Sequence, residues 1–235
     1  MWSRIGSCAV CAWLIALSSC DKPSARSEPQ LPQPEHPSAA PAPDARQVLV
    51  VFGDSLAAGF GLDPGQSFPD DLQRKLDAEG YSWHVVNLGI SGDTTEGGVS
   101  RMDSAASLHP SVVIVELGGN DGLRGLPLAV TRKNLETMLQ TFQGAGARVV
   151  LAGMTLPPNY GQTYIQGFER IYQEIARQHH LTLIPFLLSD IVTPDLRYLQ
   201  RDGIHPTAEG AEIVSGTVLR AIKPLLDQST GSPVR

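Results

Sequence analysis

The chain has 235 residues and an apolar content of 42%, which is enough for one globular domain with a packed core. Its formal net charge is −6 and it has no basic stripe, so nucleic acid is not an expected partner. All three cysteines, Cys8, Cys11 and Cys20, lie within the first twenty residues, which excludes a disulfide or a thiolate metal site from the rest of the chain.

The first twenty residues have the features of an export signal. Arg4 precedes an apolar run from Ile5 to Leu17, whose 13 residues are fewer than the roughly 18 to 20 that a membrane-spanning helix needs. The tetrapeptide Leu17-Ser18-Ser19-Cys20 then resembles the lipobox of bacterial lipoproteins, in which the cysteine is lipidated and becomes the new amino terminus. An ordinary cleaved signal and an uncleaved anchor are the alternatives.

We therefore expect residues 1–20 to be a lipoprotein-type signal peptide and Cys20 to carry a lipid anchor. The protein would be exported to the periplasm and held at a bacterial membrane, either inner or outer.

Residues 21–46 have the composition of a disordered linker. They include seven prolines among Ala, Ser, Gln and single charges, a mixture that cannot bury enough apolar surface to fold. If extended at about 3.1 Å per residue, the linker could hold a domain tens of ångströms from a bilayer. A tail without any such role is an equal alternative. A second disordered tail is predicted at residues 229–235, after a domain that spans residues 47–228.

From Gln47 onward, patterns typical of buried strands alternate with patterns typical of helices. Strands are expected at residues 48–52, 83–88, 112–117, 148–152 and 181–186. Helices are expected at residues 67–79, 94–107, 126–143, 164–178 and 207–226. Such alternation predicts parallel strands joined by right-handed crossovers, and hence an α/β domain with three layers, α/β/α.

A serine follows the first predicted strand. Gly53 ends the strand and leaves Ser55 at its carboxyl end, where open parallel sheets have their active sites. A serine hydroxyl becomes a good nucleophile when a histidine, itself held by a carboxylate, accepts its proton. His205 stands three residues after Asp202 in a glycine-containing loop ahead of the last helix, so we predict a catalytic set of Ser55, His205 and Asp202. Taken alone, Asp-Gly-x-His-Pro could instead be only a turn and a helix start.

Acyl transfer also needs hydrogen-bond donors for the oxygen that becomes negative in the tetrahedral intermediate. We predict three: the backbone N–H groups of Ser55 and Gly92 and the side-chain amide of Asn120. Gly92 follows the second strand and Asn120 the third, so all three should lie at one edge of the sheet. Each has a structural alternative, Gly92 as a turn glycine and Asn120 as a turn or helix cap.

Other catalytic motifs are absent from the sequence. Ala57 stands where an α/β-hydrolase elbow, Gly-x-Ser-x-Gly, would have its last glycine. There is no glycine-rich phosphate loop, His-Glu-x-x-His helix or Cys-x-x-Cys pair. Asp54 and Asp93 could indicate a metal site, but acids at loop starts more often accept hydrogen bonds from backbone N–H groups.

Four blocks of sequence resemble the SGNH hydrolases, also called GDSL-type esterases. They are Gly53-Asp54-Ser55-Leu56, Gly92, Gly119-Asn120-Asp121 and Asp202-Gly203-Ile204-His205, in the order and spacing of that family. The longer runs 52–56, 90–94, 116–125 and 157–161 are similar to its arylesterase, acyl-CoA thioesterase and lysophospholipase branch. The resemblance implies a flavodoxin-like sheet of five strands in the order 2-1-3-4-5. It also implies a hydrolase without a cofactor or a metal.

Two loops are expected to border the substrate pocket, residues 122–126 and residues 156–164. Their apolar side chains indicate a channel for an acyl or aryl group, and we predict substrate contacts from Leu123, Leu156, Pro157 and Tyr160, with core packing as the alternative role.

The function predicted from sequence is that of a serine esterase that hydrolyses carboxylic esters and thioesters through an acyl-enzyme on Ser55. Aryl esters, short-to-medium acyl esters, acyl-CoA and lysophospholipid are the expected substrates. The alternatives are a carbohydrate acetylesterase with the same machinery and a non-catalytic lipoprotein that binds acyl chains. No obligate protein partner is evident in the sequence.

Overall fold

A computed structural model describes residues 44–229 of the chain. Cys20, the predicted signal peptide and all but the end of the predicted linker lie outside the described residues, as do the last six residues. The predicted boundaries of these segments therefore stay predictions.

The centre of the fold is a sheet of five parallel strands in the order β2-β1-β3-β4-β5, which confirms the predicted topology. β1 lies between β2 and β3, and its Val50 pairs with Val86 on one side and Val113 on the other. The strands are β1 Gln47–Gly53, β2 Trp83–Asn87, β3 Val112–Glu116, β4 Arg148–Ala152 and β5 Thr182–Ile184.

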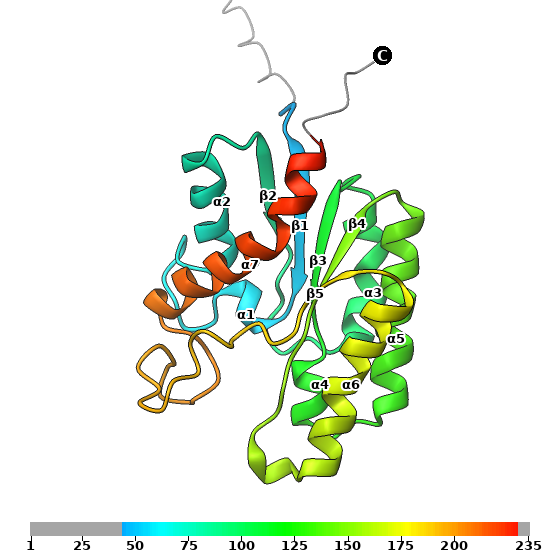
Figure 1. Cartoon of the computed structure of the whole chain (residues 1–235), viewed down its shortest axis with the longest axis vertical. Coiled ribbons are helices and arrows are strands. Elements are labelled where there is room, and N and C mark those ends of the chain that lie inside the picture. The colour runs from blue at the N-terminus through cyan, green and yellow to red at the C-terminus, as the bar shows by residue number, and fades with distance from the viewer. Residues whose placement is uncertain (1–43, 230–235) are drawn as a thin grey trace, which may run out of the picture. The chain divides into compact units, whose positions relative to one another are not determined.

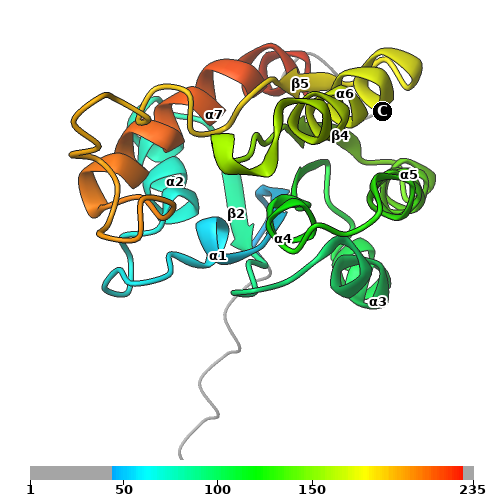
Figure 2. The same ribbon diagram turned by 90° about the horizontal axis from the view of Figure 1, so that it is seen from below.

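Helices cover both faces of the sheet (Figures 1 and 2). α2 and α7 pack against each other on one face, while α3, α5 and α6 pack side by side on the other. The long helices are α2 Phe68–Ala78, α3 Thr95–Ala106, α5 Leu128–Gly144, α6 Gln162–Gln178 and α7 Ala208–Ser229. Among residues 44–229, none of these helices has the length and apolar character needed to cross a bilayer.

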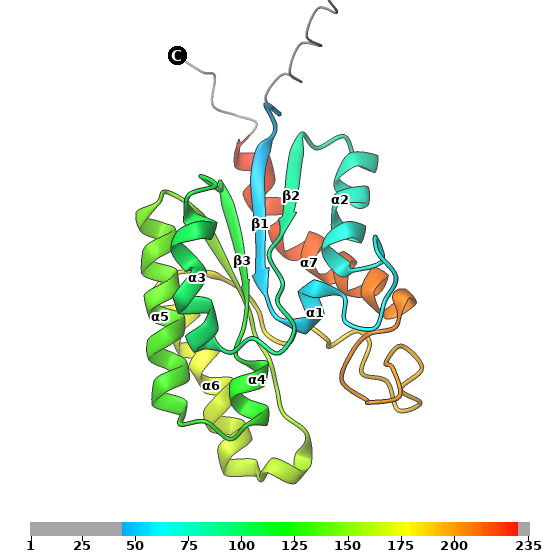
Figure 3. The ribbon, with the colours of Figure 1, turned by 180° about the vertical axis from the view of Figure 1, so that it is seen from behind.

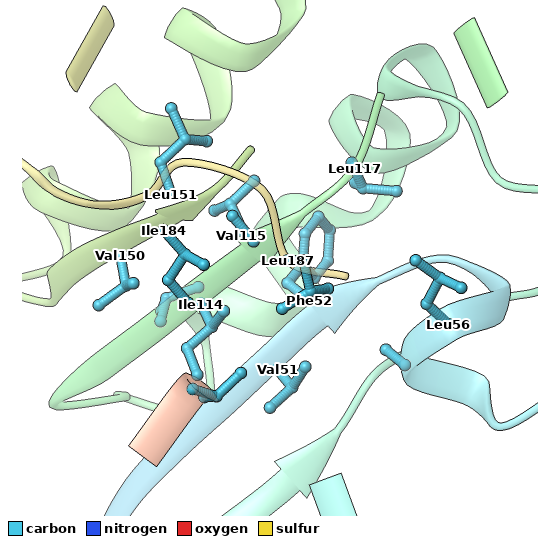
Figure 4. Packing of buried hydrophobic residues seen from close by; sticks show 14 of the residues in the cluster. Val51, Phe52, Leu56, Ile114, Val115, Leu117, Val150, Leu151, Ile184 and Leu187 are labelled. Carbon is cyan, nitrogen blue, oxygen red and sulfur yellow. The ribbon is translucent and has the colours of Figure 1, made fainter. Parts of the chain in front are cut away.

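The central strands supply most of the core, as their continuous apolar runs predict. Side chains such as Val51, Phe52, Ile114 and Val115 have no exposed surface and pack between the helical layers (Figure 4). A strand buried on both faces cannot alternate polar and apolar residues, because every position meets a helix. The core is therefore a rigid support for the loops and short helices that follow the strand ends.

Two short helices that the sequence patterns did not predict follow directly after strands. They are α1 Ser55–Ala58, after β1, and α4 Gly119–Leu123, after β3. At four and five residues they are too short to show a hydrophobic period. Both lie at the carboxyl edge of the sheet, the edge where all five strands end, opposite the end where the described chain enters β1 (Figures 1 and 3).

The last strand is shorter than predicted, with three residues in place of six. Pro185 has no N–H to continue the ladder, so the chain leaves the sheet after Ile184. The following segment runs along the carboxyl edge to the start of α7.

Candidate active site

Ser55 is held at the carboxyl edge by the end of β1 and the start of α1. Asp54 caps the helix, and its Oδ1 accepts the N–H of Leu56 at 3.1 Å. This is the capping role predicted for Asp54. Ser55 is the first residue of α1, so its own N–H has no acceptor within the helix.

The loop before α7 brings His205 and Asp202 to Ser55. His205 Nε2 lies 2.8 Å from Ser55 Oγ, and His205 Nδ1 lies 2.6 Å from Asp202 Oδ2. Asp202 Oδ1 also accepts the backbone N–H groups of Ile204 at 2.9 Å and His205 at 3.0 Å. The three side chains are therefore hydrogen-bonded in series, in the order predicted from the sequence.

These contacts determine which ring nitrogen of His205 carries the hydrogen. Burial by itself raises the pKa of Asp202, but hydrogen bonds from the His205 backbone and ring and from Ile204 outweigh it and lower the pKa below its ordinary value. The carboxylate is thus ionised and accepts the Nδ1 hydrogen. Nε2 is left with a lone pair directed at the Ser55 hydroxyl. Phe60, which is 51% exposed, packs against the imidazole with ring centroids 4.6 Å apart.

Asn120 lies in the first turn of α4 and contacts the segments that carry the other two predicted donors. Its Nδ2 donates to Asp54 Oδ2 at 3.1 Å, next to Ser55, and to the backbone oxygen of Asp93 at 2.9 Å, next to Gly92. The structure therefore gathers Ser55, Gly92 and Asn120 at one place. Both hydrogens of the Asn120 amide are already donated, so an oxyanion would have to share or replace one of these two acceptors.

Gly92 adopts a left-handed conformation, with φ of 81°, which explains a glycine at this position. Its backbone oxygen accepts a hydrogen bond from Arg124 Nη2 at 2.8 Å. The N–H of Gly92 donates to no acceptor among residues 44–229. The peptide at Gly92 is thus fixed from one side and has a free donor on the other.

Arg101, on α3, connects the two loops that carry Ser55 and Gly92. Its Nε donates to Asp93 Oδ2 at 2.7 Å, Nη1 to the backbone oxygen of Leu88 at 2.8 Å, and Nη2 to that of Gly53 at 2.9 Å. The guanidinium also lies over the ring of Phe52, 3.9 Å from its centroid. Asp93 therefore binds this arginine, whereas Thr94 caps α3.

Two acids are buried behind the site. Asp54 is 2% exposed, and Glu116, the last residue of β3, is fully buried. Glu116 Oε2 accepts the backbone N–H of Asp54 at 3.1 Å. Burial raises the pKa of Asp54 to about 6, and burial together with the nearby charge of Asp54 raises the pKa of Glu116 well above its ordinary value.

An apolar cavity of about 390 Å³, here called the site cavity, lies beside these residues. Gly119 and the Gly203-Ile204 pair line it, and these are the chain neighbours of Asn120 and His205. The remaining lining residues are Leu123, residues 154–158, Phe186, Leu188, Val192 and Leu199.

Leu123, Leu156 and Pro157, which were predicted to contact substrate, all line the site cavity, whereas Tyr160 does not. The Tyr160 hydroxyl instead donates to the backbone oxygen of Leu123 at 2.7 Å and joins the two predicted loops.

The sequence did not predict the wall of the site cavity that residues 186–199 form, nor the packing of Phe60 against His205. The one signal for that wall was a group of apolar residues, 186–188 and 191–192, outside any helical period. Within residues 44–229, no three histidine, aspartate or glutamate side chains are placed to bind a metal ion.

A serine, a histidine and an aspartate joined in series at the carboxyl edge of a flavodoxin-like sheet define the class of SGNH hydrolases. Comparison with known families agrees. The chain belongs to the GDSL-like lipase/acylhydrolase family, whose model matches residues 51–213.

Individual relatives cover most of the chain. It is 44% identical over 183 residues to "Esterase TesA" of Pseudomonas aeruginosa, an alignment that covers 77% of this chain and 90% of the relative. It is 39% identical to "Arylesterase" of Vibrio mimicus, with coverage of 72% and 84%. It is 34% identical to "Thioesterase 1/protease 1/lysophospholipase L1" of Escherichia coli K12, with coverage of 79% and 88%.

Solved structures give the same result. A crystal structure of TesA superposes with a TM-score of 0.73 at 43% identity, and covers 76% of this chain and 99% of its own. The esterase EstA from a Pseudoalteromonas species, in a structure inhibited by monoethylphosphonate, superposes with a TM-score of 0.72 at 32% identity, with coverage of 77% and 99%.

The Arg101 contacts predict a measurable effect on stability. Replacing Arg101 with Met removes three hydrogen bonds and leaves the Asp93 carboxylate, which is mostly buried, without its cation. We expect the free energy of unfolding to fall by about 2 kcal/mol, measured by urea denaturation. Arg170→Met is a matched control, because Arg170 is an exposed residue of α6. Equal midpoints for the two variants would show that the Arg101 contacts do not stabilise the loops.

Proposed function

We propose that the protein hydrolyses carboxylic esters and thioesters through an acyl-enzyme on Ser55. The observation that carries the proposal is the 2.8 Å hydrogen bond between Ser55 Oγ and His205 Nε2, next to an apolar cavity of about 390 Å³. The relatives named esterase, arylesterase and thioesterase/lysophospholipase support the same chemistry. Aryl esters, short-to-medium acyl esters, acyl-CoA and lysophospholipid are the proposed substrates.

In the first half of the reaction, Ser55 Oγ attacks the carbonyl carbon of the substrate while His205 Nε2 accepts the hydroxyl proton. Asp202 stabilises the imidazolium that forms, because it already holds the Nδ1 hydrogen. The tetrahedral intermediate collapses when His205 passes its proton to the leaving alcohol or thiol. Water then attacks the acyl-enzyme with His205 as base again. His205 returns this proton to Ser55 Oγ as the bond from Oγ to the acyl carbon breaks, and the carboxylic acid leaves.

The negative oxygen of the intermediate is proposed to bind the N–H groups of Ser55 and Gly92 and the amide of Asn120. Such donors stabilise a transition state because they are oriented before charge develops. Asn120 is oriented by Asp54 and by the backbone of Asp93.

The site cavity is proposed to hold the acyl or aryl group. Its volume lies near the lower end of the about 300 to 1,000 Å³ typical of small-ligand sites, and its lining side chains are apolar except for Thr155.

Removing the nucleophile should abolish turnover. We expect Ser55→Ala to lower kcat on the order of 10⁴- to 10⁶-fold, because no other group at the site can form the acyl-enzyme. A fluorophosphonate should label wild-type protein but not this variant, in line with the phosphonate-inhibited relative. Ser104→Ala, at an exposed position of α3, is the control for a serine without a role. Labelling that persists in Ser55→Ala would overturn the assignment.

Removing the side-chain donor of Asn120 should lower kcat less than removing the hydroxyl of Ser55. Asn120→Ala is expected to reduce kcat roughly 10²-fold or more, because one stabilising contact to the oxyanion is lost. KM should change little, and circular dichroism should show an unchanged fold. A variant with wild-type kcat would remove Asn120 from the proposed oxyanion hole.

Narrowing the site cavity should shift the preferred chain length. Val192 lines the cavity and is 47% exposed, so Val192→Trp can add bulk there without overpacking the core. We expect kcat/KM for an octanoyl ester to fall at least tenfold relative to that for an acetyl ester. Val130→Trp, at a similarly exposed position on α5, should leave the ratio unchanged. Equal ratios in both variants would place the acyl group elsewhere.

We also propose that the protein is exported and held at a bacterial membrane by a lipid on Cys20. The support is the Leu17-Ser18-Ser19-Cys20 tetrapeptide at the end of a short apolar run. Cells fed labelled palmitate should yield labelled wild-type protein in the membrane fraction, whereas Cys20→Ser should be unlabelled. Label that persists in Cys20→Ser would contradict the anchor.

A further inference from the structure

We propose that Glu116 is a positioning residue that keeps its carboxyl proton at neutral pH and donates it to Asp54. The two buried acids would then carry one negative charge between them, and this charge would hold the amide of Asn120. The functional part of this proposal rests on the proposed role of Asn120 in the oxyanion hole.

The position of Glu116 provides the first argument. Its side chain is fully buried at the end of β3, and Oε2 accepts the Asp54 backbone N–H at 3.1 Å. Oε1 is buried as well and has no hydrogen-bond partner of ordinary geometry in the described part of the chain. A Cβ at Gly53 would lie 2.3 Å from Oε2, so the carboxyl group occupies space that the glycine leaves open. The carboxyl group of Glu116 is thus enclosed against the end of β1.

The charges around Glu116 provide the second argument. Asp54 faces it from the turn before α1 and Tyr172 from α6. His205 interacts with Asp54, and Arg101 of α3 donates to the backbone oxygen of Gly53. The Tyr172 hydroxyl donates to the backbone oxygen of Leu117 at 3.0 Å.

All hydrogen bonds found for Arg101 go to Asp93, Leu88 and Gly53. No cation in the described residues therefore pairs with Glu116. A buried carboxylate without a cation and beside another acid is strongly disfavoured. Burial, followed by the charge of Asp54, raises the pKa of Glu116 and outweighs the backbone N–H groups of Asp54 and Ala57, which lower it.

The contact between the two acids provides the third argument. Glu116 Oε2 accepts the backbone N–H of Asp54, so the two acids lie next to each other. A hydrogen bond between their side chains would require a proton, because two carboxylates can only accept. With Glu116 as donor, Asp54 stays an acceptor for Leu56 N–H and for Asn120. The chain of contacts therefore runs from Glu116 through Asp54 to Asn120.

Two substitutions of similar size separate this role from simple packing. The amide of Glu116→Gln can donate to Asp54 and accept its N–H, as a protonated Glu116 would, whereas Glu116→Met can do neither. On a p-nitrophenyl butyrate assay at pH 7, we expect kcat of Glu116→Gln to stay within about fivefold of wild type. Glu116→Met should lose about 10²-fold in kcat with little change in KM, since Asn120 loses its fixed orientation. A large loss in Glu116→Gln, or equal activity of the two variants, would overturn the proposal.

The proton itself can be observed without any catalysis. In the infrared difference between Ser55→Ala and Ser55→Ala/Glu116→Gln at pH 7, we expect the carbonyl stretch of an un-ionised carboxylic acid in the former alone. The absence of this band would overturn the proposal while leaving the role of Ser55 intact.

The pH dependence of the folding stability also distinguishes a protonated Glu116 from an ionised one. The pKa of Glu116 is higher in the folded protein than in the unfolded chain. Such a group stabilises the fold fully at a pH below its pKa in the unfolded chain. This stabilisation is lost as the pH rises toward its pKa in the folded protein. Between pH 5 and 8, the unfolding constant of Ser55→Ala should therefore rise relative to that of Ser55→Ala/Glu116→Gln, by up to tenfold per pH unit. Parallel curves would show that Glu116 is ionised in the fold.

Discussion

The hydrogen bond between Ser55 and His205 joins residues that are 150 positions apart, and the arrangement of the whole domain serves to make it. Ser55 depends on the end of a central strand, while His205 depends on a loop that returns along the carboxyl edge after the last strand. The parallel sheet brings both to one edge because all its strands end there. Asp202 then adds the local constraint that turns the imidazole toward the serine.

Asp54 has a comparable position on the other side of Ser55. One carboxylate oxygen caps the helix of Ser55, the other binds Asn120, and the backbone N–H reaches Glu116. Because Asp54 contacts all three segments, the position of Ser55 and that of the Asn120 amide cannot vary independently. Arg101 couples the Gly92 loop to the same turn, through Gly53 and Asp93.

The sheet and the polar residues at its edge could be predicted from the sequence, for separate physical reasons. Strands buried on both faces appear as unbroken apolar runs, and Asp202 lies only three residues from His205. The helix that begins at Gly119 could not be predicted, since one turn has no period.

The cavity wall from Phe186 to Leu199 could not be predicted either, because its residues belong to a loop whose shape depends on tertiary contacts. Tyr160 shows the same limit. Its aromatic ring in a predicted substrate loop gave no sign that the hydroxyl would hold a backbone oxygen.

The close approach of Glu116 to Gly53 links two positions that lie on neighbouring strands. A glycine is often required because its backbone can adopt unusual conformations. Gly53 is required for another reason: it has no side chain and so leaves space for the carboxyl group of Glu116. An alanine at 53 would have to displace a buried acid, and its methyl group would also lie 2.8 Å from the Cβ of Ala57. Position 53 is therefore confined to glycine by two neighbours at once, one on the adjacent strand and one on the helix that follows.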